Sequence, residues 1–180
     1  MADRFAADRR RVELVPHDPA WAGRAAAESA RLSEAIGATL IRIEHVGSTS
    51  IAGIVAKPTI DLMPIVRSLS ELDARRPHVE ALGYVWRGEF GIPGRRYCIL
   101  EQQGRRLFHV HCQQDGHPEV ARTLDFRDYL RAHPEEARAY EALKRVAAAA
   151  HPDDTLAYSN AKSDWIRACI ERAAEWTRRT

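Results

Sequence analysis

A single acid, Asp61, interrupts an otherwise apolar stretch from Pro58 to Val66. The stretch has the length and composition of a buried β-strand. A carboxylate in the middle of such a strand is costly unless it faces a cleft, a metal ion or a charged partner. The chain must therefore form a sheet that gives Asp61 such a partner. Two interpretations of Asp61 are equally good when it is taken alone. Its carboxylate could accept hydrogen bonds from the backbone or pair with Lys57 or an arginine, or it could be a metal ligand.

The order of apolar stretches and turn residues predicts an α+β or mixed α/β domain with helices gathered toward the C-terminus. Pro77 is expected to kink or divide a helix that runs from about Ser70 to Gly83. Strands are expected over 39–46, 58–66, 84–87, 96–102 and 105–113, with an edge strand near 11–15. Further helices are expected over 19–36, 122–130, 134–150 and 156–176.

The length of 180 residues fits one compact domain, which we expect over 13–180 after a flexible N-terminal arm over 1–12. The net charge of +2 is too balanced for a non-specific nucleic-acid binder, so we expect a small-molecule partner and no nucleic acid. The sequence also lacks a secretory signal, a membrane-spanning apolar run and a disulfide pattern among its three cysteines. These features predict a soluble cytoplasmic protein with no membrane partner and no disulfide partner, and they leave its oligomeric state undefined.

The loop Gly47-Ser48-Thr49-Ser50 follows a β-branched strand and offers backbone N–H groups and three hydroxyls in a small space. Such a loop suits a phosphate group. However, glycine and serine residues occur more often in a polar turn with a capping serine. On residue types alone, this structural turn is favoured over a phosphate site.

The segment His109-Val110-His111 is expected on a strand, where residues two apart project from the same face. The two imidazoles therefore lie side by side, as they do in many transition-metal sites. A pair of polar residues on a solvent-facing sheet surface is an equally good interpretation, because two histidines are less specific than a full ligand set.

Several cations are weaker candidates for contacts with an anionic ligand. Lys57 lies between the glycine loop and Asp61, and Arg95 and Arg96 open a strand. Tyr158 and Lys162 are four residues apart and are expected to share a helix face. Taken singly, each of these residues is more often part of the surface or of the packing than of a site.

The combination of motifs resembles the GrpB family, whose members are related to nucleotidyltransferases and also occur fused to dephospho-CoA kinase. The resemblance covers nearly the whole chain after the arm. Its motifs are VPHDPAW at 15–21, IEHVGSTSIAG at 43–53, AKPTID at 56–61, PGRR at 93–96, HVH at 109–111, LDFRDYLR at 124–131, HPE at 133–135, and Tyr158 with Lys162.

This resemblance implies a nucleotidyltransferase-like core with a mixed sheet, in which a Gly-Ser turn cradles phosphates and acids on the next strands hold divalent metal. In that superfamily the acids usually come as Asp-x-Asp or Asp-x-Glu with a later Asp. Here Leu62 and Met63 follow Asp61, and the later strand offers two histidines. Asp61, His109 and His111 are therefore expected to hold one divalent metal, either Mg²⁺ or, in better agreement with imidazole ligands, a transition metal such as Mn²⁺ or Zn²⁺.

Two functions are compatible with this resemblance. The first is a metal-dependent enzyme that transfers a nucleotidyl or phosphoryl group to a small acceptor, with Asp61, His109 and His111 as catalytic and metal-binding residues. The second is a noncatalytic module for a nucleotide-like or CoA-like ligand, which the missing second acid favours. A metal-dependent hydrolase would use the same three residues. The residues expected to bind the phosphates or nucleotide are Gly47, Ser48, Thr49, Ser50, Lys57, Arg95, Arg96 and Lys162.

Overall fold

The computed structural model describes residues 11–180 and contains a five-stranded mixed sheet in the order β1-β2-β5-β4-β3. The pair β2–β5 is parallel, and the other neighbours are antiparallel. The mixed α/β class expected from the sequence is therefore confirmed. The strands are β1 (Leu40–Val46), β2 (Ile60–Val66), β3 (Tyr84–Trp86), β4 (Arg95–Gln102) and β5 (Arg105–Gln114).

The helices begin and end close to the expected positions, with some differences. Pro77 divides the expected helix at Arg75, and the expected late helix breaks near Ala161. The prediction of an edge strand near 11–15 is wrong, because Val15 forms only an isolated bridge with Ala56. The helices are α1 (Ala20–Ile36), α2 (Leu69–Ala74), α3 (Arg76–Ala81), α4 (Pro118–Ala132), α5 (Pro134–Ala150), α6 (Thr155–Asn160) and α7 (Ser163–Arg179), with 3-10 turns at Gly37–Thr39 and Ser48–Ser50.

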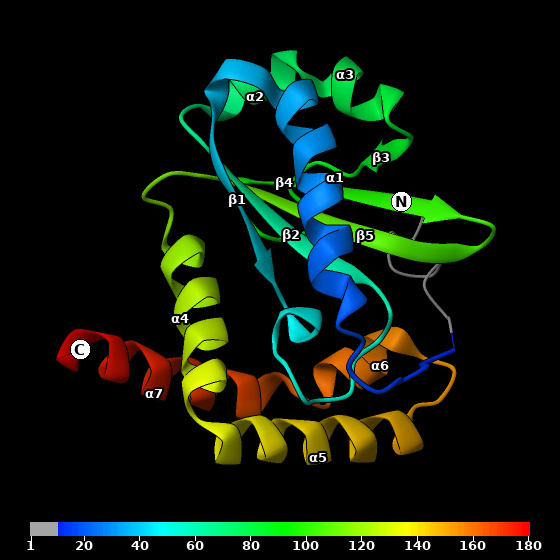
Figure 1. Cartoon of the computed structure of the whole chain (residues 1–180), viewed down its shortest axis with the longest axis vertical. Helices are drawn as coiled ribbons and strands as arrows, with labels where there is room; N and C mark the ends of the chain where they lie inside the picture. Colours follow the sequence, from blue (N-terminus) through cyan, green and yellow to red (C-terminus); the bar gives the residue numbers. More distant parts are fainter. Residues whose placement is uncertain (1–10) are drawn as a thin grey trace. The chain divides into compact units, whose positions relative to one another are not determined.

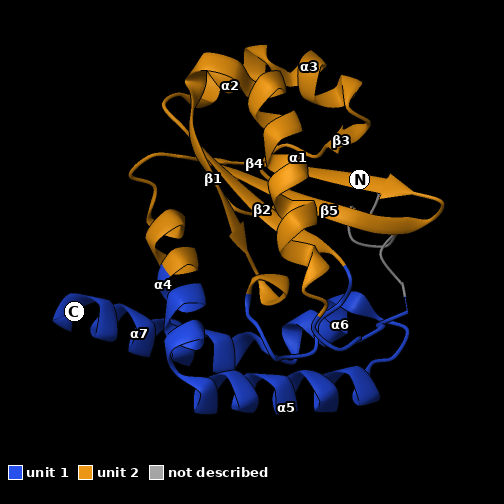
Figure 2. Cartoon of the chain, in the orientation of Figure 1, with its two compact units in different colours: residues 1–17, 51–58, 125–180 blue, residues 18–50, 59–124 orange. Residues whose placement is uncertain are grey.

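The chain forms two compact units, coloured separately in Figure 2. Of the residues that the structure describes, unit 1 comprises 11–17, 51–58 and 125–180, and unit 2 comprises 18–50 and 59–124. The single domain expected over 13–180 stays a prediction. Most of the expected arm, residues 1–10, lies outside the described residues. At the end of that arm, Val12 is buried and its N–H donates to the carbonyl of Pro152 at 2.6 Å.

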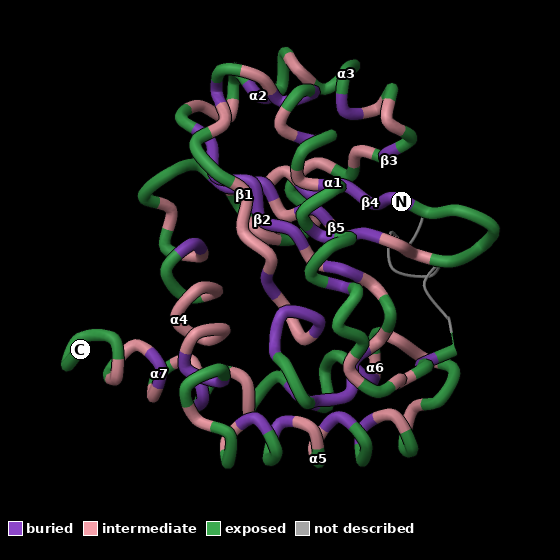
Figure 3. Tube along the Cα trace, viewed as in Figure 1, coloured by how far each residue is buried: buried purple, intermediate pink, exposed green. Residues whose placement is uncertain are grey.

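Unit 2 contains the sheet, and α1 crosses one of its faces (Figure 1). On that face the hydroxyl of Tyr84 donates to the buried carboxylate of Glu28 at 2.9 Å. Strand β2, which lies between β1 and β5, is buried along most of its length (Figure 3). The opposite face carries an apolar cluster of Val46, Met63, Ile65 and Val120. Because residues on a strand alternate between faces, Asp61 shares this second face with Met63.

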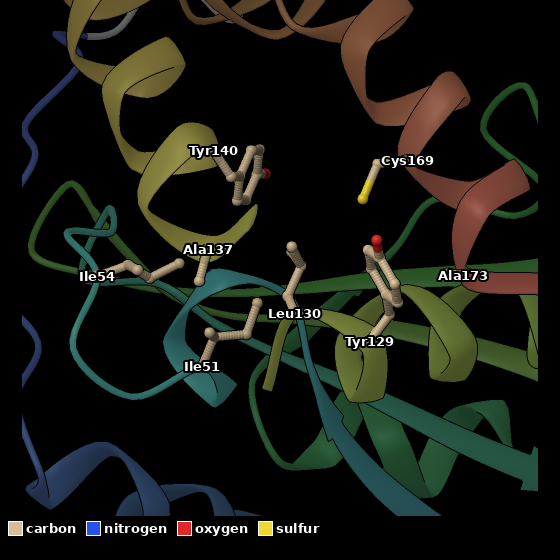
Figure 4. Close-up of a cluster of buried hydrophobic side chains, with 8 residues drawn as sticks. All are labelled: Ile51, Ile54, Tyr129, Leu130, Ala137, Tyr140, Cys169 and Ala173. Carbon is tan, nitrogen blue, oxygen red and sulfur yellow. The ribbon is translucent and has the colours of Figure 1, made fainter. Parts of the chain in front are cut away.

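Unit 1 is helical and packs around a second apolar cluster, drawn in Figure 4. Ile51 and Ile54 belong to the loop at 51–58, whereas the other members come from α4, α5 and α7. The ring of Tyr140 on α5 stacks on Trp165, with centroids 5.2 Å apart. None of the helices between residues 11 and 180 combines the length and the apolar character needed to cross a bilayer.

Lys144 is a buried residue of α5 that forms a hydrogen bond with the loop at 51–58. Its Nζ donates to the carbonyl of Val55, and the N–H of Val55 donates to Glu141 at 3.2 Å. Burial lowers the pKa of Lys144 from 10.5 to about 8, although the charge of Glu141 opposes this shift. The protonated amine is thus less favoured in the folded chain than in the unfolded chain.

This difference predicts a pH-dependent stability that the Lys144→Met variant lacks. Between pH 8 and 10.5 the unfolded state holds more protons than the folded state, so the free energy of unfolding rises with pH. We expect the wild type to gain about 3 kcal/mol relative to the variant across this window. Urea unfolding of both proteins at several pH values measures the gain. A constant difference between them would contradict the shifted pKa.

Candidate metal centre

The parallel pairing of β2 with β5 places Asp61 directly beside His109. His111 lies two residues further along β5 and projects from the same face. The Oδ1 atom of Asp61 lies 3.3 Å from Nδ1 of His109 and 3.3 Å from Nε2 of His111. One ligand atom from each of the three residues falls within 4.8 Å of the others. The structure therefore brings together the three residues that were predicted to share a metal ion.

The electrostatics of this cluster favour an ionised carboxylate. Burial by itself raises the pKa of Asp61, but hydrogen bonds from His109 and His111, together with their charge, outweigh it and hold the pKa well below its usual range. The side chains are partly accessible, with exposed fractions of 27% for Asp61, 15% for His109 and 28% for His111. The cluster is thus a charged, partly open group and not a sealed internal ion pair.

Gly47 lies against the carboxylate of Asp61. The two positions meet because Val46 pairs with Asp61 in the β1–β2 ladder. Gly47 has a φ of +68°, and a Cβ added to it would lie 2.3 Å from Oδ2 of Asp61. A side chain at this position would therefore be strained and would displace the acid. The structure thus places the glycine turn directly beside Asp61.

The hydroxyls of the turn differ in what they contact. Ser50 donates from its hydroxyl to the carbonyl of Gly47 at 2.6 Å, and Thr49 lies 2.9 Å from Nε2 of His45. Thr49 and Ser50 are buried, whereas Ser48 is half-buried. Thr49 and Ser50 therefore stabilise the turn, and Ser48 is the hydroxyl residue best exposed to a ligand.

Arg95 and Arg96 lie on opposite faces of β4. Nη1 of Arg95 lies 3.5 Å from Nδ1 of His111, and its Nη2 donates to the carbonyl of Phe90 at 2.7 Å. Arg96 instead forms two hydrogen bonds with Asp73, at 2.6 and 2.7 Å. Arg95 thus adjoins the cluster, whereas the ion pair of Arg96 lies on the other side of the sheet.

Lys57 and Lys162 lie in unit 1, together with Tyr158. The Nζ atoms of Lys57 and Lys162 are 5.5 and 3.7 Å from the centroid of the Tyr158 ring. The expected proximity of Tyr158 and Lys162 is therefore found, although Tyr158 lies on α6 and Lys162 directly precedes α7. A role for the two lysines at the Asp61 cluster stays a prediction.

Sequence reasoning did not identify the aromatic side chains beside the histidines. The ring centroid of Tyr97 lies 5.0 Å from that of His111, 5.7 Å from that of His109 and 5.2 Å from that of Phe90. Tyr97 follows Arg95 by two residues on β4, so strand alternation could have placed it on the same face. Phe90 lies in a loop, where no periodicity indicates its direction.

The fold and this cluster define a mixed α/β protein with a candidate Asp-His-His metal centre. The model of the family described as GrpB protein matches residues 11–172, and the chain belongs to the GrpB family. The crystal structure of the conserved protein GrpB from Enterococcus faecalis is similar with a TM-score of 0.87 and 35% identity, over 92% of this chain and 99% of that one. The membership predicted from the sequence is confirmed.

Two curated relatives are longer than this chain. UPF0157 protein YqkA of Bacillus subtilis is 41% identical over 168 residues, which cover 93% of this chain and 49% of YqkA. A protein named dephospho-CoA kinase from Mycolicibacterium paratuberculosis is 32% identical over 190 residues, covering 92% of this chain and 46% of that protein. The chain thus spans about half the length of each.

The contact between Gly47 and Asp61 predicts that Gly47→Ala weakens metal binding. Gly104→Ala is a matched control, because Gly104 has a φ of +73° but open space around an added Cβ. Both variants place alanine in the left-handed region, at a cost of about 1–2 kcal/mol. We expect only Gly47→Ala to displace Asp61 and to lower Mn²⁺ affinity, by about 10- to 100-fold. Isothermal titration calorimetry measures the affinity, and equal affinities of the two variants would contradict this role.

Proposed function

We propose that this protein transfers a nucleotidyl or phosphoryl group from a nucleotide-like substrate to a small acceptor, with one divalent metal ion. The observation that carries the proposal is the convergence of Asp61, His109 and His111 beside the Gly47 turn. In the nucleotidyltransferase-like proteins that the sequence resembles, a glycine turn and a metal-binding acid occupy consecutive strands in the same way. This chain spans about half of each longer relative, so the names of those relatives do not assign it a substrate.

The donor atoms of the cluster determine which ions suit it. Two imidazole nitrogens and one carboxylate oxygen favour Mn²⁺, Fe²⁺ or Zn²⁺, whereas Mg²⁺ prefers oxygen ligands. The position of a second acid is taken by Met63, which is buried in the apolar cluster of unit 2. One ion is therefore proposed instead of two. When bound, it supplies Lewis-acid stabilisation of charge on a phosphoryl oxygen.

The residues around the ion would hold the phosphates. Ser48 offers a hydroxyl and the turn offers backbone N–H groups, and the guanidinium of Arg95 offsets negative charge next to His111. Catalysis in this arrangement consists mainly of positioning and of electrostatic stabilisation.

The proposal predicts that metal and nucleotide stabilise the protein together. Saturation at about 100 times the dissociation constant should raise Tm by roughly 5–10 °C for a chain of this size. Differential scanning fluorimetry with Mn²⁺, Zn²⁺ or Mg²⁺, with and without a nucleoside triphosphate, measures the shift. Asp61→Ala should abolish it, whereas Asp153→Asn, at an exposed acid, should keep it. The proposal fails if no pair of metal and nucleotide changes Tm.

The burial of Met63 where a second acid is usual also supports a noncatalytic module that binds a nucleotide-like or CoA-like ligand. Binding that survives EDTA and the His109→Ala change would select this alternative. A metal-dependent hydrolase keeps the same site, and release of product without any acceptor would identify it.

A further inference from the structure

The loop between β3 and β4 holds an aromatic side chain in an unusual backbone conformation. Phe90 has a φ of +44°, in a segment where Gly88, Gly91 and Gly94 also have positive φ. A bulky residue in this region costs about 1–3 kcal/mol and persists only where the surroundings impose it. A glycine at position 90 would adopt the same backbone without that cost. The loop therefore retains a phenyl ring at an energetic disadvantage.

Arg95 fixes this loop beside the candidate metal centre. Its Nε donates to the carbonyl of Glu89 at 3.2 Å, and its Nη2 donates to that of Phe90. The carboxylate of Glu89 in turn accepts from the N–H of Gly94 at 2.7 Å. The same guanidinium lies next to His111. The position of Phe90 is thus coupled to the metal centre by one side chain.

The rings of Phe90, Tyr97 and His111 form a continuous series. Phe90 stacks on Tyr97 with an interplanar angle of 26°, and Tyr97 meets His111 at 32°. Tyr97 is buried, whereas Phe90 is half-buried. Phe90 and His111, at the two ends of the series, are both partly accessible, and Phe90 is the accessible ring that is not itself a candidate metal ligand.

From this arrangement we infer that Phe90 stacks against the nucleobase of the ligand, an inference that rests on the proposed function. A metal ion and Arg95 recognise an anionic group, and the adjacent ring recognises a planar aromatic one. A nucleotide carries both groups, whereas a sugar phosphate and inorganic polyphosphate lack the planar ring. Phe90 therefore selects nucleotides among phosphorylated ligands.

The test compares ATP, GTP, CTP and UTP with inorganic tripolyphosphate, each with saturating Mn²⁺, by isothermal titration calorimetry. We expect the wild type to bind at least one nucleotide more tightly than tripolyphosphate. Phe90→Leu, which keeps apolar bulk without the ring, should weaken that nucleotide about tenfold or more and leave tripolyphosphate and Mn²⁺ affinities unchanged. Phe90→Trp should retain nucleotide affinity, because its ring still stacks.

The outcomes separate this inference from the proposed function. If the wild type binds a nucleotide with metal but Phe90→Leu binds it equally well, the stacking role is wrong and the proposed function stands. The same conclusion follows if Phe90→Leu weakens tripolyphosphate as much as the nucleotide. If the wild type binds no phosphorylated ligand with any metal, the proposed function itself is overturned.

Discussion

The candidate centre depends on the parallel register of β2 and β5, which pairs Asp61 with His109. A shift of one residue would reverse the faces on which the side chains lie and separate the acid from both imidazoles. The neighbouring antiparallel ladder adds a second constraint, since Val46 pairs with Asp61 and brings the Gly47 turn against the carboxylate. Two strand pairings, one glycine and one acid are therefore mutually dependent, and a change in any one of them disturbs the others.

Strand alternation predicted much of this arrangement, because it is a local property. It placed His109 and His111 on one face, and the cost of a carboxylate within an apolar strand identified Asp61 as the residue in β2 that needed a partner. Alternation also separates Arg95 from Arg96, although both were candidates for the same ligand. The order of the strands follows from tertiary packing and is not encoded in any local pattern. The burial of Lys144 was likewise beyond local reasoning, because its partner Val55 is 89 residues away.

The motif at 43–53 combines two structural roles, which explains why its residue types alone were ambiguous. Its first part ends β1 and forms the turn whose glycine meets Asp61, within unit 2. Its second part supplies Ile51, which packs in the apolar cluster of unit 1. The hydroxyls of Thr49 and Ser50 bond within the β1–turn segment, as in a structural turn, and their part in binding a phosphate stays a prediction. The phosphate interpretation then rests on Ser48 and the backbone.

Met63 occupies the position of the usual second acid, and its apolar packing in this chain opposes a second carboxylate there. Met63 is 1% exposed and lies with Val46, Ile65 and Val120, so a carboxylate at that position would replace these apolar contacts with a buried charge. The remaining donor set carries one negative charge with neutral imidazoles, so a divalent ion would leave the centre net positive. Arg95 adds a further positive charge beside His111. Such a centre attracts an anionic ligand more strongly than a centre with several carboxylates, whose charges cancel that of the ion. In the proposed function, one acid instead of two favours a transition metal over Mg²⁺ and leaves the centre attractive to a phosphate group.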